Sequence, residues 1–91
     1  MIQRIKTVED VKKFTKDVVE EGVNFHPDTD FNDYINITTN KPFYTKQEAE
    51  FRNDLVNQCF KLCERKGIEI YEITCTVFWE VTGLNKAFNI A

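Results

Sequence analysis

Oxygen-bearing side chains alternate in the segment FHPDTDFNDYIN, residues 25–36. Asp28, Asp30 and Asn32 have the spacing of the first three ligands of an EF-hand calcium loop. That loop also requires a glycine at its sixth position, for a sharp turn, and a bidentate glutamate at its twelfth. Here the sixth position is an aspartate and the twelfth is a threonine. The segment is therefore better interpreted as a short helical turn that aspartates cap and aromatic side chains anchor.

The single histidine of the chain, His26, lies at the start of the same segment. Together with Asp28 and Asp30 it forms an alternating triad, an arrangement that some divalent-metal sites use. A lone cluster without a second histidine is a weak signal, so a loop histidine held by hydrogen bonds is the preferred interpretation. The preferred interpretation has no metal or cofactor, and a divalent-metal-binding protein using His26, Asp28 and Asp30 is the second hypothesis.

The cysteines do not predict an enzyme. Cys59 and Cys63 lie four residues apart on one face of a predicted helix, among leucine and phenylalanine, where we expect small buried thiols rather than zinc ligands. The chain contains no serine and no glycine-rich phosphate loop, so the usual hydrolase nucleophile and the usual nucleotide cradle are both missing. We therefore expect a non-catalytic protein.

Acidic side chains are concentrated in the first half of the chain. The net charge is −3, and residues 17–40 contain six acidic side chains and no lysine or arginine. The ordinary interpretation is a solvated face that pairs with basic residues of the same fold. The functional interpretation is a surface that meets a basic partner or a cation. The residues predicted for this interaction surface are Glu20, Glu21, Asp28, Asp30, Asp33 and Trp79.

Three glycines, each followed by a bulky aliphatic residue, predict the ends of three helices. The expected helices span about residues 8–21, 46–66 and 69–82. Thr7 with Asp10 and Thr45 with Glu48 have the spacing of capping residues at the starts of the first two. Apolar residues recur at three and four positions along each segment, which is typical of helices that bury one face.

The third segment is ambiguous, because residues 68–82 also alternate apolar and polar side chains as a strand does. Its β-branched content favours a strand, whereas its length and its closing glycine favour a helix. The preferred fold is mainly α, and an α+β fold with residues 68–82 as a strand is the alternative. Between the first two helices we expect a helical turn and a small β-hairpin around Thr39 to Lys41. No linker divides the chain, so residues 1–91 are predicted to form a single domain.

The segment 25–36, followed by FYTKQEAEFRNDLVNQCFKLCERKGIEIYEI, resembles a set of small bacterial proteins. The shared features are an FHPDxDFxDY element ahead of a threonine-capped helix and a glycine followed by a hydrophobic residue, an acid and Tyr-Glu-Ile. The resemblance implies a bacterial setting and favours the helix after Gly67. It implies no activity.

The number of large aromatic side chains suggests a partner. Eight Phe, three Tyr and one Trp are many for a core of three helices, and Phe78, Trp79, Phe88 and Ile90 lie near the C-terminal end. A charged N-terminus and the absence of a long apolar run predict a cytoplasmic protein without a membrane segment. Net acidity without a basic stripe argues against nucleic-acid binding. The sequence therefore predicts a small interaction protein that docks on itself or on another protein.

Overall fold

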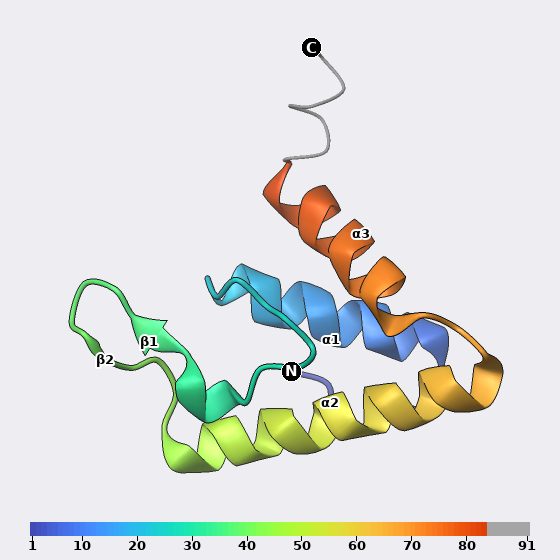
Figure 1. The fold of residues 1–91 in the computed structure, drawn as a ribbon, viewed down its shortest axis with the longest axis horizontal. Coiled ribbons are helices and arrows are strands. Elements are labelled where there is room, and N and C mark those ends of the chain that lie inside the picture. The colour runs from blue at the N-terminus through green and yellow to red at the C-terminus, as the bar shows by residue number, and fades with distance from the viewer. Residues whose placement is uncertain (84–91) are drawn as a thin grey trace.

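The computed structural model describes residues 1–83 and contains three α-helices (Figure 1). They are α1 (Val8–Glu20), α2 (Lys46–Lys66) and α3 (Ile70–Thr82). α1 packs against both α3 and α2, and α3 rises away from the long axis of α2. The predicted mainly α fold is confirmed, with each predicted helix boundary within one residue of the observed one. None of the helices in the described part of the chain is long and apolar enough to cross a lipid bilayer.

The starts of α1 and α2 are determined by residues within a single turn. Thr7 Oγ1 accepts a hydrogen bond from the Asp10 backbone N–H at 3.2 Å, and the Asp10 carboxylate accepts one in return from the Thr7 N–H at 3.0 Å. Thr45 and Glu48 form the same reciprocal pair, at 3.1 and 2.9 Å. Each pair satisfies backbone donors that have no partner inside the helix.

Residues 70–82 form a helix, so the strand alternative for residues 68–82 is wrong. Gly83 adopts a left-handed conformation with φ 78°, and its N–H donates to the Trp79 carbonyl at 2.8 Å, which ends α3. The helix buries Ile70, Ile73 and Val77 on one side. β-branched residues lower helix propensity by only a few tenths of a kcal/mol each, and burial of this apolar side outweighs that effect.

The middle segment contains the predicted helical turn and hairpin. A 3₁₀ turn, η1 (Phe31–Asp33), precedes two short antiparallel strands, β1 (Ile35–Asn36) and β2 (Lys41–Pro42). The turn between the strands includes Asn40 at φ 56°, a conformation that asparagine tolerates better than most residues. The Asn36 side-chain oxygen accepts hydrogen bonds from the backbone N–H groups of Thr38 and Thr39, at 2.9 and 3.2 Å.

Three phenylalanines join the middle segment to the helical core. Phe31 of η1 is fully buried, and its ring centroid lies 6.3 Å from that of Phe14 on α1 and 5.7 Å from that of Phe25. The Phe31 backbone N–H also donates to the Asn53 side chain on α2 at 2.9 Å. These contacts hold the segment before η1 between α1 and α2, and thereby fix the position of the acidic residues that follow Phe25.

Candidate functional site

Helix α3 has three distinct sides. The side facing the core consists of Ile70, Ile73, Thr74 and Val77, all of them buried. A second side, which we call the outer aromatic face, consists of Tyr71, Cys75, Phe78 and Trp79. The third is polar and includes Glu72, Thr76 and Glu80. Trp79 keeps 45% of its surface exposed and Tyr71 keeps 39%, so the core covers only one of the two apolar sides.

A small hollow lies between the outer aromatic face and the loop of residues 24–30. Its volume is about 170 Å³, and Phe25, His26 and Pro27 form its wall on the loop side. The hydroxyl of Tyr71 donates a hydrogen bond to the carboxylate of Asp28, which ties the loop to α3. The hollow therefore combines aromatic rings with a carboxylate at its edge.

A second hollow, of about 390 Å³, lies between the same loop and α2. Asp30 lines it, and one oxygen of this carboxylate accepts hydrogen bonds from the Asn32 N–H and from the Asn53 side chain, each at 2.8 Å. The backbone bond from Asn32, followed by the bond from Asn53, lowers the pKa of Asp30 below its usual value. Asp30 is therefore ionised at neutral pH, and it remains exposed.

The residues of the metal hypothesis have separate partners. The His26 backbone N–H donates to the hydroxyl of Tyr34 at 2.9 Å, Asp28 is bound by Tyr71, and Asp30 is bound by asparagines. Among residues 1–83, no three histidine, cysteine, aspartate or glutamate side chains gather as a metal site would require. Alternation in the sequence has not brought these three side chains into one cluster, and metal binding stays a prediction without geometric support.

The other predicted acidic residues lie away from the two hollows. Glu20 is exposed and pairs with Lys16 at 3.9 Å on the surface of α1. Asp33 is exposed in η1. Glu21 is used within the fold, because its carboxylate is held by Arg52 on α2 at 2.6 and 3.1 Å. Of the predicted acidic residues, only Asp28 is hydrogen-bonded to the helix that carries Trp79. Asp30 lies in the same loop against α2, and Glu20 lines the groove on another side of α3.

Arg52 is a structural residue that the sequence analysis did not identify. It is buried in the folded chain, and its guanidinium carbon lies 4.5 Å from the ring centroid of Tyr44. The guanidinium donates two hydrogen bonds to the Glu21 carboxylate. The hydroxyl of Tyr44 donates to the same Glu21 carboxylate at 2.8 Å. Burial, and then the bond to Glu21, raises the pKa of Tyr44 well above its usual range. The sequence feature that could have indicated this role is the position of Arg52 within the row of apolar residues along α2.

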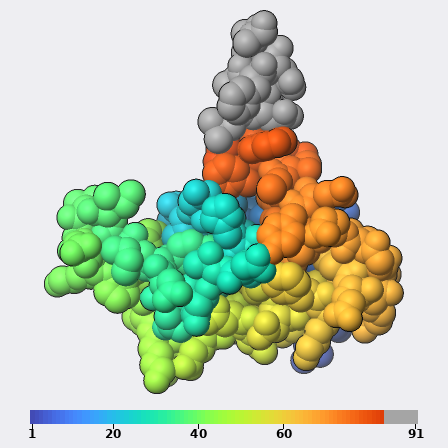
Figure 2. Space-filling view, viewed as in Figure 1, coloured from blue at the N-terminus to red at the C-terminus, as the bar shows by residue number. Residues whose placement is uncertain are grey.

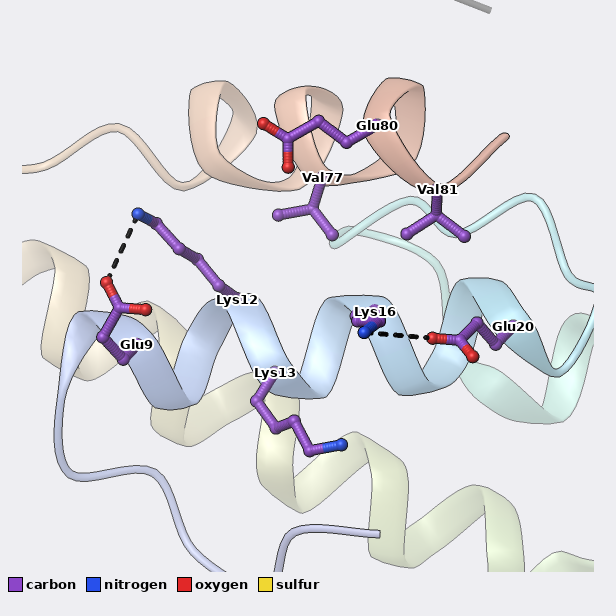
Figure 3. A pocket seen from close by; sticks show the side chains of 8 residues that line it. All are labelled: Glu9, Lys12, Lys13, Lys16, Glu20, Val77, Glu80 and Val81. Atoms are coloured by element: carbon purple, nitrogen blue, oxygen red, sulfur yellow. Dashed lines mark hydrogen bonds and ion pairs between the residues drawn. The ribbon is translucent and has the colours of Figure 1, made fainter. Parts of the chain in front are cut away.

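A larger groove, of about 730 Å³, runs between α1 and α3 (Figure 3). Val77 and Val81 point from α3 toward α1, while lysines and glutamates lie along α1. The lysines are already paired on their own helix, with Lys12 at 3.4 Å from Glu9 and Lys16 at 3.9 Å from Glu20. These exposed pairs balance the charge of the groove, so the groove has no net charge that would favour a cationic or an anionic partner.

The three thiols are expected to react very differently. Cys59 and Cys63 are buried on α2, as the sequence predicts, and burial raises the pKa of Cys59 to about 12 and also raises that of Cys63. Cys75 is exposed on the outer aromatic face. We expect a chromogenic disulfide reagent at pH 8 to label one thiol rapidly and the other two only as the protein unfolds. Cys75→Ala should abolish the fast phase, and rapid labelling of that variant would contradict the assignment.

The outer aromatic face was only partly predicted. Trp79 and Phe78 were identified from the sequence, whereas Tyr71 was not. The signal that could have found it is the spacing of four between Tyr71, Cys75 and Trp79, which places all three on one side of a helix. Phe88 and Ile90, which were also predicted to contribute apolar surface, lie outside the described residues.

The chain matches no protein family model, no curated protein and no solved structure.

Proposed function

We propose that this protein is a non-catalytic interaction protein of the bacterial cytoplasm, which docks on another protein chain through the outer aromatic face of α3. The observation that carries the proposal is that α3 is apolar on two sides and buries only one of them. A helix that is apolar around most of its circumference is normally enclosed by other elements. Here the exposed side carries Trp79 and Tyr71, the residue types most enriched among the energetic centres of protein interfaces.

The residues beside this face support recognition of a protein partner. The hollow between Tyr71 and the loop offers a pocket into which an apolar side chain can insert. Asp28 at its edge offers a charged acceptor in a fixed position, because Tyr71 holds it. An apolar centre with charged groups at its rim is the usual anatomy of a protein interface.

The proposal is tested with Trp79→Asp, which places a charge at the centre of the face without disturbing a buried side chain. The wild type should either scatter light as a dimer or retain a stoichiometric partner protein during purification from its native host. Trp79→Asp should lose that complex, because a buried interfacial tryptophan contributes about 2 kcal/mol or more. Ile37→Asp, at a position 97% exposed in the hairpin turn, is the control and should keep it.

Unchanged melting temperatures in both variants would show that the fold is intact. If the wild type is monomeric and every protein that copurifies with it is retained equally by Trp79→Asp, the face is not an interface and the proposal is wrong.

A further inference from the structure

We infer that the partner of the outer aromatic face is a basic amphipathic helix of another protein, rather than a second copy of this chain. The inference rests on the proposed function and adds the chemistry of the partner to it. Three observations lead to it: the aromatic surface adjoins an acidic one, the described part of that surface has no cation, and its walls are helices.

The two hollows beside the 24–30 loop adjoin each other. Pro27 lines both of them, and Asp28, which lines the hollow against α2, accepts the hydrogen bond from Tyr71 in the hollow against α3. In Figure 2 the loop, in teal, lies between α3 in orange and α2 in yellow. A single ligand can therefore contact Trp79 at one end of the surface and Asp30 toward the other.

The charge on this surface has one sign. Asp28 and Asp30 line it, and neither carboxylate has a lysine or arginine as a hydrogen-bond partner. Of the lining residues that the structure describes, none is a lysine or arginine. The lysines of α1 line the groove on a different side of α3, together with Val77 and Val81 (Figure 3). The negative potential here attracts a cationic partner and speeds its encounter.

A second copy of the chain fits this surface poorly. In a two-fold symmetric dimer the same patch meets itself. Asp28 and Asp30 would then face a partner patch that, over its described residues, offers carboxylates and no cation. Like charges brought together in an interface oppose association, so the chemistry favours a different protein that supplies lysine or arginine.

The shape of the surface favours a helical partner. Its two walls are α2 and α3, and the backbone groups of a helix are already hydrogen-bonded within that helix. An added strand needs free backbone donors and acceptors, whereas a helix in a groove is recognised through its side chains alone. Apolar side chains of such a helix would lie on Phe78 and Trp79, with lysine or arginine reaching Asp28 and Asp30.

The test uses the full chain and synthetic peptides of about 18 residues, long enough for stable amphipathic helices. One peptide combines leucine and lysine at helical spacing, the second replaces lysine with glutamate, and the third has the first composition in scrambled order. None contains tryptophan, so fluorescence reports only Trp79, the single tryptophan of the chain. We expect the lysine peptide to shift the emission to shorter wavelength and the other two to leave it unchanged. Added salt should weaken the binding.

Charge-neutral variants localise the binding. Asp28→Asn with Asp30→Asn removes two charges and keeps side chains that can still hydrogen-bond and cap the turn. This variant should bind the lysine peptide about tenfold more weakly. Glu9→Gln with Glu20→Gln removes two charges from the α1 groove instead, and it should bind within about twofold of the wild type. Trp79→Ala, followed through a label on the peptide, should lose more than about fivefold in affinity.

The outcomes separate this inference from the proposed function. The inference that the partner is basic is wrong if the lysine and glutamate peptides bind equally well, or if the two double variants weaken binding of the lysine peptide to the same extent. The proposed docking through the outer aromatic face would still stand in that case. A dimer that Trp79→Asp dissociates, with no peptide binding, would identify the occupant as a second copy. If no peptide binds and no complex depends on Trp79, both the inference and the proposed function are wrong.

Discussion

Phe31→Ala is expected to lower the free energy of unfolding by about 3–5 kcal/mol, the usual loss when a fully buried phenylalanine is truncated. Phe31 has no exposed surface, and its ring centroid lies within 6.3 Å of those of Phe14, Phe25, Tyr34 and Tyr44. These neighbours are large rings held by separate elements, so they cannot collapse readily into the cavity. The expected loss is a large share of the roughly 5–15 kcal/mol that stabilises a typical domain.

Thermal and urea unfolding measure this effect, and the melting temperature should fall by more than about 10 °C. Phe31→Leu is the matched control, because it keeps most of the apolar volume and should lose roughly half as much or less. Since Phe31 anchors η1 and the loop before it, Phe31→Ala should also weaken the binding of any partner that contacts Asp28. If Phe31→Ala were as stable as Phe31→Leu, Phe31 would not be the centre of the aromatic cluster.

Glu21→Ala is expected to have the second largest effect on stability, lowering the free energy of unfolding by about 2–4 kcal/mol. Removing one partner of a fully buried ion pair usually costs about 3–5 kcal/mol, because the other charge stays buried without compensation. The value is somewhat lower here because the Glu21 side chain is 28% exposed, against 10% for Arg52. In the wild type, burial tends to lower the pKa of Arg52, and its bonds to Glu21 outweigh burial and raise the pKa. The variant loses those bonds, but the guanidinium stays charged because its intrinsic pKa lies far above neutral pH. The hydroxyl of Tyr44 loses its acceptor as well.

The neighbouring residue provides the control for this prediction. Glu20→Ala breaks only an exposed pair with Lys16 and should change stability by less than about 0.5 kcal/mol. Arg52→Met, which removes the buried charge and fills its space, should cost less than Glu21→Ala. Denaturant unfolding of these variants measures all three values. Equal losses for Glu20→Ala and Glu21→Ala would show that Glu21 is as solvated as Glu20 and that the pair with Arg52 contributes little.

The sequence by itself determined α1, α2 and the positions at which the helices end, because these signals are local. The capping pairs Thr7 with Asp10 and Thr45 with Glu48 act within one turn, and the glycines at the ends act on the last turn of each helix. Such signals depend on neighbours three or four residues away, which a sequence displays directly. The buried positions of Cys59 and Cys63 followed from the same periodicity.

Only the tertiary structure decided what became of residues 68–82. Both periods fit the sequence, and the choice depends on whether a neighbouring strand edge or a helical surface is available. The described hairpin has strands of two residues each, whereas α1 offers an apolar side that accepts Ile70, Ile73 and Val77. Burial against α1 satisfies the apolar side chains, and the helix satisfies its own backbone.

The candidate surface was likewise decided by contacts between distant residues. The sequence shows six acidic side chains in residues 17–40, but it does not show which residues they contact. Glu21 met Arg52, 31 residues away, and became part of the fold, whereas Asp28 met Tyr71, 43 residues away, and stayed exposed beside the outer aromatic face. Which carboxylate pairs internally and which faces outward depends on how the chain folds back on itself. That choice is not encoded in the spacing of neighbouring residues, so only the tertiary structure separates the stabilising acidic residues from those available to a partner.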